Sequence, residues 1–385
     1  MAYGTVAGRY TDESALFRSR MQDACATGDE RPYMDGRSTE IIEPRSYLSQ
    51  AKDLICSIPG ICCSIFSRSI SIALFPFNWM IENRLGVAKF VGIAMVPSQL
   101  FPWLGKHFPD LIPELRGFPD LQKSREIVAA ACETGNTNGR RTESLKIKTD
   151  LGVLNGVICF PSDWDRKNEQ CILYHNPNGI VLSQLLQTGH LHPLSTPGQI
   201  QSEMKCPVIL YDYRGTGLNQ TDGVLGYFPF STYETVVQDG VTALGYALER
   251  FQHVYVAGSS LGGGVATASL QRHLEAKGGQ DDSRVKLLSH DSFTTTSRVV
   301  IPSRPRLADF LGWMVGGNLD AETPMRKLID RGVAVKVLNH TYDPVIPKGA
   351  RMSEFANTQS GNISVFESHY LGHAVLTNDM KDKLR

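Results

Sequence analysis

Residues 254–270 read VYVAGSSLGGGVATASL, and this stretch decides which fold the chain can adopt. A short apolar run, typical of a buried parallel strand, enters a Gly-Ser-Ser-Leu-Gly turn, and small residues then open a helix. The Gly-x-Ser-x-Gly spacing selects Ser260, because a pattern centred on Ser259 would need glycine where the chain has alanine. Gly258 and Gly262 suit positions at which a side chain would clash with neighbouring backbone. The stretch predicts a strand–turn–helix that presents Ser260 as a candidate nucleophile.

Short apolar runs alternate with helical patterns over the rest of the C-terminal two thirds of the chain. A hairpin is expected within 144–160, and the strongest helix pattern lies within 231–251, where apolar residues recur at helical spacing. Ser231 and Glu234 form a capping-box pattern at the start of that helix. Further strands are expected at 171–174, 208–211, 254–257, 285–288, 333–338 and 363–366. The alternation predicts an α/β fold with a mostly parallel, doubly wound sheet and helices on both faces.

A serine hydroxyl attacks only when a histidine takes its proton and a carboxylate orients that histidine. Asp343 follows one predicted strand in VKVLNHTYDPVIP, and His373 follows the next in ISVFESHYLGHAVL, ahead of a terminal helix. The order Ser, Asp, His is the one expected after an elbow of this kind. His369 competes for the role of base, and Asp291, in SHDSF, is the alternative acid. We favour His373 because a glycine precedes it and a helix follows.

Two other loops follow predicted strands. The loop at 175–179, His-Asn-Pro-Asn-Gly, is placed to supply an oxyanion-hole amide from Asn176, with Leu261 supplying the other. In YDYRGTG, Asp212 and Arg214 are predicted to brace the elbow, with Arg214 paired inside the protein and not with substrate. Asp212 and Arg214, like Gly258 and Gly262 of the turn, are predicted to support the site without a catalytic role.

These motifs resemble the α/β-hydrolase superfamily over about residues 143–385. The resemblance rests on YDYRGTG, AGSSLGGG, Asp343 and Gly-His-Ala at His373, which occur in order at compatible spacing. The His-Asn-Pro-Asn-Gly loop and an apolar N-terminal extension are most similar to the chlamydial CHLPS-type hydrolases of bacteria that live inside host cells. The resemblance implies an α/β-hydrolase fold, a serine hydrolase and an effector-like protein. The 175–179 loop departs from the pattern of many esterases at Pro177, which has no N–H to donate.

The sequence divides into three zones. Residues 1–50 are polar and predicted to be a mobile arm, residues 51–142 are predicted to be an apolar, helical extension, and residues 143–385 are the predicted catalytic domain. Residues 291–331 interrupt the core pattern and include an apolar stretch around Trp313. This insertion is a candidate for a small lid and equally for a helix that packs on the core.

Two stretches of the extension, 54–81 and 85–104, are long enough to span a bilayer. The first contains Arg68, whose cost of about 3 kcal/mol offsets the about 3 kcal/mol gained from its apolar neighbours; the second contains Lys89 and prolines. Three interpretations stay open: helices packed on the core, an interfacial anchor over 54–104, or a bilayer hairpin. Cysteines beside these apolar residues would then be acylation candidates, namely Cys56, Cys62 and Cys63.

Composition narrows the function classes. The 385 residues carry a formal net charge of zero, which argues against a nucleic-acid partner. Eight scattered cysteines without a CxxC pair favour reduced thiols in a reducing compartment and no zinc ribbon. The polar start lacks an apolar signal-peptide core. We therefore expect a cytoplasmic or membrane-associated protein, or one exported into a host cell without a cleaved signal.

The combined prediction is a serine hydrolase that cleaves an ester or thioester with an acyl or lipid-like group. No cofactor or metal is expected, and the glycine run at 262–264 is no P-loop because no Gly-Lys-Ser/Thr follows it. A catalytically idle scaffold that acts at a membrane or on a partner is the competing class, and a peptidase is a third. The oligomeric state is left open.

Overall fold

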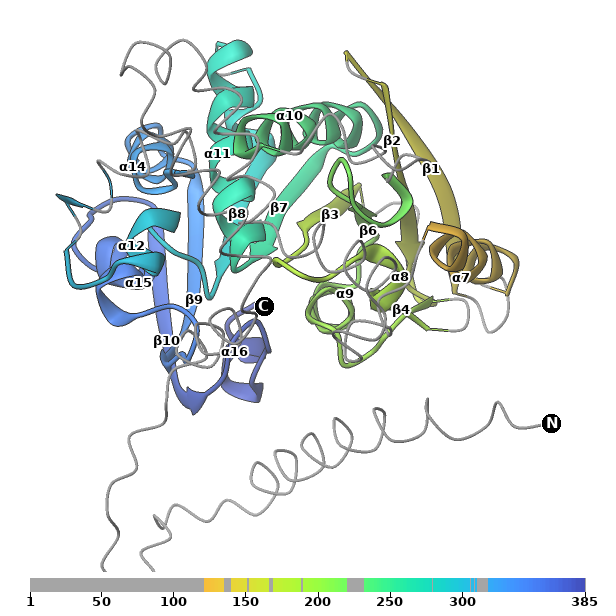
Figure 1. Ribbon diagram of the computed structural model, residues 1–385. Coiled ribbons are helices and arrows are strands. Elements are labelled where there is room, and N and C mark those ends of the chain that lie inside the picture. The colour runs from red at the N-terminus through yellow and green to blue at the C-terminus, as the bar shows by residue number, and fades with distance from the viewer. Residues whose placement is uncertain are drawn as a thin grey trace, which may run out of the picture. The chain divides into compact units, whose positions relative to one another are not determined.

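In the computed structural model of the chain, an eight-stranded sheet runs through the centre of the described part (Figure 1). The structure describes residues 121–134, 140–150, 152–165, 169–187, 190–219, 232–278, 280–304, 306, 307, 309 and 318–384. The strands of this sheet are β1 (Arg141–Thr149), β2 (Gly152–Phe160), β3 (Gln170–His175), β6 (Val208–Tyr211), β7 (His253–Ser259), β8 (Val285–His290), β9 (Ala334–Tyr342) and β10 (Ile363–Leu371). A two-stranded sheet joins β4 (Leu186–Gln187) to β5 (His190–Leu191).

The strand order is β1-β2-β6-β3-β7-β8-β9-β10. The predicted hairpin is present, because β1 pairs antiparallel with β2 from Arg141↔Phe160 to Thr149↔Gly152. Strand β2 is antiparallel to β6, whereas β6, β3, β7, β8, β9 and β10 are parallel neighbours. From β3 the chain first adds β6 on one side and later β7 on the other. The direction in which strands are added reverses at β3, which makes this a topological switch point. Open α/β sheets bind ligands in the crevice outside the carboxyl ends of the strands at such a point.

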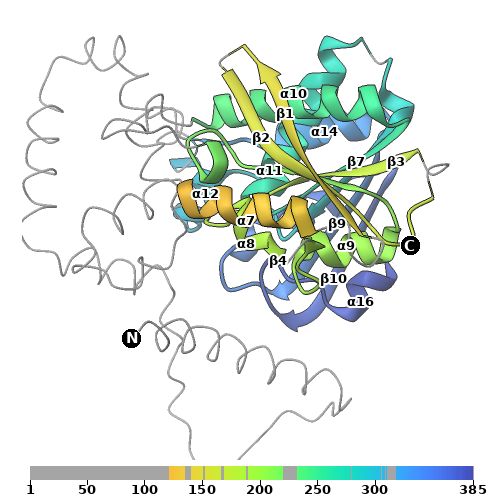
Figure 2. The ribbon, with the colours of Figure 1, turned by 90° about the vertical axis from the view of Figure 1, so that its right-hand side faces the viewer.

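Helices cover both faces of the sheet (Figures 1 and 2). Buried residues of α10 (Tyr233–Arg250), α11 (Leu261–Ala276), α14 (Glu322–Asp330) and α15 (Met352–Ala356) belong to one apolar cluster. Those of α7 (Leu121–Thr134), α8 (Leu182–Leu185), α9 (Thr196–Met204) and α16 (Asn378–Asp382) belong to another. The remaining elements are short: α12 (Thr296–Val300), η3 (Gly217–Asn219), η4 (Asp282–Arg284) and η5 (Lys348–Ala350). This is the predicted doubly wound architecture, the α/β-hydrolase fold.

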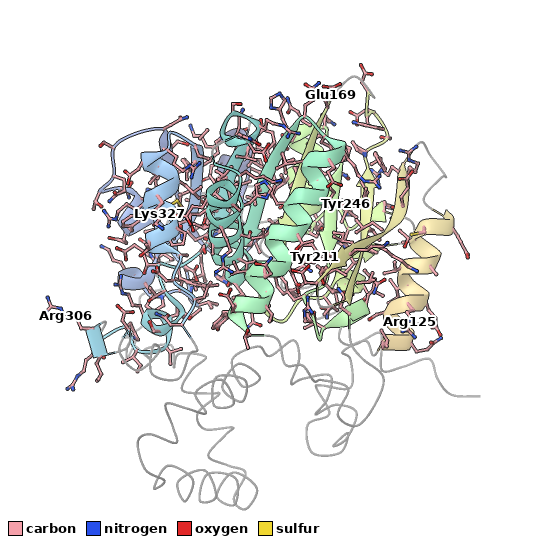
Figure 3. All side chains as sticks on the ribbon, turned by 90° about the horizontal axis from the view of Figure 1, so that it is seen from above. Arg125, Glu169, Tyr211, Tyr246, Arg306 and Lys327 are labelled. Carbon is pink, nitrogen blue, oxygen red and sulfur yellow. The ribbon has the colours of Figure 1, made fainter. Side chains whose placement is uncertain are left out.

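Alternate residues of the central strands enter opposite clusters. On β6, Ile209 and Tyr211 join the cluster under α10 and α11, and Val208 and Leu210 join the other. All four are fully buried, as a strand covered on both faces requires. In the view from above, Tyr211 lies within the body of the domain, whereas Lys327 lies at the edge (Figure 3). The apolar runs in the sequence therefore mark strands buried on both sides.

Helix α10 begins one residue later than the capping pattern predicted. Its N-cap is Thr232, whose Oγ1 accepts the N–H of Thr235 at 3.2 Å, while the Thr235 hydroxyl accepts the N–H of Thr232 at 2.9 Å. The predicted pair of Ser231 and Glu234 is thus wrong: Ser231 lies outside the described residues, and Glu234 forms an ion pair with Arg272 of α11. The Thr–Thr box satisfies the N–H groups of the N-cap and of the third helical residue, the same two positions that a Ser–Glu box satisfies.

Several predictions concern residues outside the described part. They are the mobile arm at 1–50, the apolar stretches at 54–104 with their cysteines, and Trp313 of the candidate lid. Of the 291–331 insertion, residues 291–304, 306, 307, 309 and 318–331 are described, and within them α14 packs Met325, Leu328 and Ile329 into the core. Within the described ranges, no helix is long and apolar enough to cross a bilayer.

Four cysteines lie in the described part, and all are free thiols. Burial raises the pKa of Cys159 and Cys206 to about 12, so both stay protonated at neutral pH. Cys171 is also fully buried. These three behave as small apolar core residues.

Candidate active site

Ser260 lies on a strained turn between β7 and α11. Its backbone has φ 54° and ψ −120°, a conformation that costs a side-chain-bearing residue roughly 1–3 kcal/mol. The Ser260 N–H donates to the carbonyl of His290 at 2.9 Å, and its own carbonyl accepts the hydroxyl of Ser292 at 3.0 Å. The residue as a whole is 8% exposed. The surrounding backbone therefore holds this serine in an unfavourable geometry at the carboxyl end of a central strand.

The two glycines of the turn are required by close backbone approaches. A Cβ on Gly258 would lie 2.2 Å from the carbonyl oxygen of Gly262. A Cβ on Gly262 would lie 2.0 Å from the carbonyl oxygen of His175 and 2.7 Å from that of Asn176. Real side chains do not tolerate such distances. The start of α11 thus rests directly on the loop that follows β3.

His373 and Asp343 form a pair at the same edge of the sheet. Asp343 follows β9 and His373 follows β10, and His373 Nδ1 lies 2.8 Å from Asp343 Oδ2. The other carboxylate oxygen accepts the N–H groups of Val345 and Ile346 at 2.7 and 2.9 Å, which fixes the carboxylate. Among the described residues, the Ser260 hydroxyl forms no hydrogen bond. The Nε2 of His373 is left as the ring nitrogen available to a nucleophile.

The competing histidine has a different environment. His369 lies within β10, is exposed, and its Nδ1 is 3.3 Å from the hydroxyl of Thr341. Among the described residues it contacts no carboxylate. The structure therefore brings His373, and not His369, to an acid.

The candidate oxyanion donors lie on both sides of the turn. Leu261 is the first residue of α11, where an N–H has no partner within the helix. Asn176 is buried next to Gly262, its carbonyl accepts the Tyr213 hydroxyl at 2.8 Å, and its Nδ2 donates to the Tyr211 carbonyl at 3.3 Å. Contacts of its carbonyl and side chain therefore hold Asn176 against the start of α11.

Asp212 and Arg214 both bond to protein groups. Asp212 accepts the N–H of Leu182 at 2.6 Å and that of Leu218 at 2.8 Å. Burial raises the pKa of Asp212 to about 7, against the effect of these two amides. Arg214 forms a two-pronged ion pair with buried Asp239. Both residues tie the loop after β6 to the helices around it.

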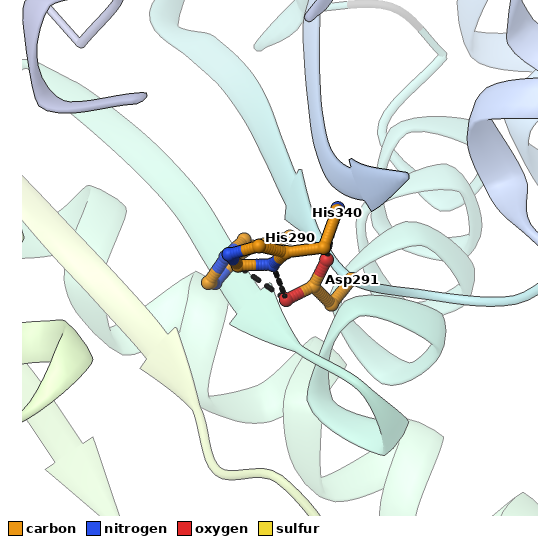
Figure 4. Close-up of side chains that lie close together, drawn as sticks. All are labelled: His290, Asp291 and His340. Carbon is orange, nitrogen blue, oxygen red and sulfur yellow. Dashed lines mark hydrogen bonds and ion pairs between the residues drawn. The ribbon is translucent and has the colours of Figure 1, made fainter. Parts of the chain in front are cut away.

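Sequence reasoning did not foresee the polar cluster beneath these loops. Asp291, the alternative acid, bonds to His340 Nδ1 at 2.8 Å and lies 3.2 Å from His290 Nε2, outside hydrogen-bonding geometry (Figure 4). All three side chains are at most 1% exposed. The available signal was that SHD and NH stand at the ends of successive strands, but nothing in the sequence indicated that they meet. We call Asp291, His290 and His340 the Asp291 cluster.

Charge in this cluster is concentrated on the carboxylate. Burial alone would raise the pKa of Asp291, but His290, His340 and His373 outweigh it and lower that pKa to about 2. Burial lowers the pKa of His290 to about 4, only partly opposed by Asp291. At neutral pH the carboxylate is therefore ionised and His290 is neutral.

Two groups in the described part have the composition of a metal site. They are the Asp291 cluster itself and the set of Asp291, Asp343 and His373, whose potential ligand atoms lie within 4.8 Å of one another. In the cluster, Asp291 Oδ2 already accepts the His340 Nδ1–H and the Ala374 N–H, at 2.8 and 2.7 Å. Both donors direct protons at the oxygen a metal would need, so a hydrogen-bonded carboxylate accounts for this geometry.

The strand order and the elbow at Ser260 define an α/β-hydrolase-fold protein. Neither a family model nor a curated protein matches the chain, so the similarity to chlamydial CHLPS-type hydrolases stays a prediction. Solved structures do match. An esterase of Pyrobaculum calidifontis has 17% identity and a TM-score of 0.42, over 75% of this chain and 95% of its own.

Two further matches have similar values. A thermostable carboxylesterase from a metagenomic library has 16% identity and a TM-score of 0.40, over 69% of this chain and 91% of its own. An α/β serine hydrolase without a lid from Xanthomonas campestris has 12% identity and a TM-score of 0.35, over 59% and 83%. Identities and scores this low leave the function to be argued from the residues of the chain itself.

Proposed function

We propose that this protein is a serine hydrolase that cleaves an ester or thioester with an acyl or lipid-like group. One observation carries the proposal: a serine on a strained strand–helix turn stands at the same sheet edge as a hydrogen-bonded His373–Asp343 pair. Because β7, β9 and β10 are parallel, Ser260, Asp343 and His373 follow strands that end at the same edge of the sheet. A strained nucleophile and an oriented base are the groups that acyl transfer requires.

The reaction follows from the position of each group. Ser260 Oγ attacks the substrate carbonyl carbon while His373 Nε2 takes its proton. Asp343 holds the Nδ1–H and stabilises the imidazolium that forms. The tetrahedral intermediate collapses, the alcohol or thiol leaves with the proton from His373, and the acyl group stays on Ser260. A water molecule activated by His373 then releases the acid and restores the serine.

Two amides would stabilise the negative oxygen of the intermediate. Leu261 provides one from the first turn of α11, where the helix dipole also favours negative charge. Asn176 would provide the other from the loop that contacts Gly262. Each such donor is worth about 3 kcal/mol of transition-state stabilisation.

A fluorophosphonate probe tests the nucleophile. We expect the folded protein to be labelled once, on Ser260, as shown by mass spectrometry of the peptide that contains both adjacent serines. Ser260→Ala should abolish labelling and ester hydrolysis. Ser289→Ala is the matched control, because Ser289 is buried on β8 and its hydroxyl has no hydrogen-bond partner among the described residues. An unlabelled wild type would favour the idle-scaffold alternative, and label on Ser260→Ala would rule out this nucleophile.

The substrate class can be narrowed with p-nitrophenyl esters of increasing chain length. An acyl or lipid-like substrate predicts that kcat/KM rises with chain length. A preference for the shortest ester would overturn that part of the proposal and count against a lid at 291–331.

Residues 54–104 are proposed as a contact with a membrane surface on the basis of composition alone. Flotation of the full chain with vesicles of neutral and anionic lipid tests this. A protein that stays at the bottom of the gradient with both vesicle types would exclude it. A reducing compartment and export into a host cell are likewise proposed from the sequence alone.

A further inference from the structure

Asp291 connects two strand ends to the loop that carries the base. It is fully buried at the end of β8, where its backbone has φ 42°. One carboxylate oxygen accepts the N–H of His340 at 2.8 Å. The other accepts His340 Nδ1–H at 2.8 Å and the N–H of Ala374, directly after His373, at 2.7 Å. A single carboxylate therefore bonds to β9 and to the residue next to the base.

The loop around His373 is held on both of its sides. A Cβ on Gly372 would lie 2.8 Å from His340 Nε2, so the ring of His340 touches the backbone that precedes the base. Ala374 has φ 56°, an unfavourable value for alanine, and its carbonyl accepts the Thr196 hydroxyl at 2.5 Å. These contacts restrict the backbone on either side of His373 to one conformation.

The same cluster extends to the nucleophile. His290 Nδ1 lies 2.9 Å from the hydroxyl of Ser259, which accepts the Tyr174 hydroxyl at 2.9 Å. The His290 carbonyl accepts the N–H of Ser260 at 2.9 Å. Buried polar groups thus lie in sequence from Ser259 to Ala374, although His290 Nε2, 3.2 Å from Asp291 Oδ2, is not hydrogen-bonded to it. The bonds of Asp291 itself are complete, and a satisfied buried carboxylate rigidifies the segments that it connects.

We propose that Asp291, together with His340, is a positioning residue that sets where His373 stands relative to Ser260. Asp343 remains the acid that bonds to His373 Nδ1. Asp291 acts on the backbone of the loop, where it accepts the N–H of Ala374. Its negative charge adds to that of Asp343 when His373 takes the proton. The proposal rests on the serine-hydrolase function above.

The titratable groups that face His373 come from the ends of two strands, β8 and β9. Carboxylate oxygens of Asp343, after β9, and of Asp291, after β8, lie within 4.8 Å of a His373 ring nitrogen. The neutral His290 and the His340 ring lie behind Asp291. Removal of the Asp291 charge therefore leaves one of two nearby negative charges to favour the protonated ring.

The first experiment measures steady-state hydrolysis of a p-nitrophenyl ester by the full-length Asp291→Asn protein. Because a misplacement of about 1 Å costs on the order of 100-fold in rate, we expect kcat to fall roughly 10- to 100-fold with KM nearly unchanged. The acidic limb of the pH profile of kcat/KM should move to lower pH. Ser289→Ala, two residues earlier in the chain, should match the wild type in both. An unchanged kcat and acidic limb in a folded Asp291→Asn protein would overturn the proposal.

A second pair of variants keeps the test decisive if Asp291→Asn does not fold. His340→Asn retains an amide donor near the position of Nδ1, whereas His340→Leu removes the donor at similar volume. We expect His340→Leu to lower kcat and His340→Asn to restore a large part of it. Equal activity of the two would contradict the proposed role of the hydrogen bond.

Hydrogen exchange separates this proposal from the function on which it rests. In the full chain, the peptide containing Ala374 should exchange faster in Asp291→Asn than in the wild type, even in a protein that binds no fluorophosphonate. Equal exchange would overturn the positioning role, whereas an unlabelled wild type would overturn the hydrolase function alone. A stoichiometric metal in the purified wild type that is lost in His340→Leu would show a metal site in place of a hydrogen-bonded carboxylate.

Discussion

At the scale of single residues, the active-site turn depends on glycines, which have no Cβ atom. Gly262 leaves room for two carbonyl oxygens of the loop after β3, at distances that no Cβ could occupy. Ser260 carries its side chain in a conformation that glycine would adopt at less cost. Spacing in the sequence identifies both positions, whereas the reason for each is a backbone approach between segments about 85 residues apart.

Gly262→Ala should abolish fluorophosphonate labelling and lower the free energy of unfolding by roughly 2 kcal/mol or more, because the loop or the helix must move. Gly245→Ala is the control. It lies within α10 with open space where a Cβ would stand, so alanine there should raise that free energy by about 0.5–1 kcal/mol. Urea denaturation of both variants gives the comparison. A Gly262→Ala protein with wild-type labelling would refute the described geometry.

Asp291 predicts a particular pH dependence of stability. Its pKa of about 2 in the folded protein is below the ordinary value of 3.8. Its contribution, about 2 kcal/mol, is therefore complete above pH 3.8 and lost as the pH falls through about 2. The stability difference between the wild type and Asp291→Asn should shrink between pH 4 and pH 2.

Asp212 is the control of opposite sign. Its folded pKa of about 7 is raised, so its relative contribution is greatest below pH 3.8 and is lost as the pH rises through about 7. The difference between the wild type and Asp212→Asn should fall between pH 4 and pH 7. Flat differences for both variants in urea titrations would contradict the assigned charges.

At the scale of elements, a sequence pattern predicted the helix α10 correctly but its N-cap one residue too early. The helix is where apolar spacing predicts it, and Val237, Leu244 and Leu248 are buried. Its cap is nevertheless Thr232. Ser231 and Thr232 both suit an N-cap, and the choice between them depends on how the preceding chain enters the helix, which local sequence does not specify.

Thr232→Ala should lower the free energy of unfolding by about 1 kcal/mol, because the N–H of Thr235 loses its partner. Thr242→Ala is the matched substitution within the same helix. Its hydroxyl bonds only to the carbonyl of Gln238, one turn earlier, so its removal should change stability by less than about 0.5 kcal/mol. Thermal and urea unfolding measure both, and equal effects would place the cap elsewhere.

At the scale of the whole molecule, the described core begins before the predicted catalytic domain at 143. Helix α7 buries Leu121, Val128 and Ala131, and Ser124 Oγ lies 3.2 Å from the hydroxyl of Ser183 in α8. Val128 and Ala131 belong to the same cluster as residues of α8, α9 and α16. The helix is therefore part of the layer that covers one face of the sheet.

A truncation series tests this boundary. Deletion of residues 1–110 should keep fluorophosphonate labelling and the cooperative unfolding of the core. Deletion of residues 1–138 also removes α7, and since burial of one large apolar side chain is worth about 1.5–3 kcal/mol, it should lower stability by several kcal/mol. Equal melting temperatures of the two truncated proteins would show that α7 adds nothing to the core.

The sequence by itself determined the order of the candidate groups along the chain: the elbow at Ser260, an acid at Asp343 after the next strand but one, and a histidine at His373 after the last. These follow from local signals, namely apolar runs, glycine spacing and chain order. Two carboxylates remained open as the acid, and two histidines as the base. Chain neighbours favour His373 over His369, but they do not show which carboxylate meets it.

Only the tertiary structure assigned these groups to partners. It pairs His373 with Asp343 and sends Asp291 to His340 and to the Ala374 amide. It also reveals that Arg214 meets Asp239 and that His290 meets Ser259. For the pairs at strand ends the physical reason is the same, whereas Arg214 and Asp239 meet because α10 packs against the loop after β6. Parallel strands bring residues 30 to 85 positions apart to one edge, and their pairing depends on register and burial, which are properties of the assembled sheet.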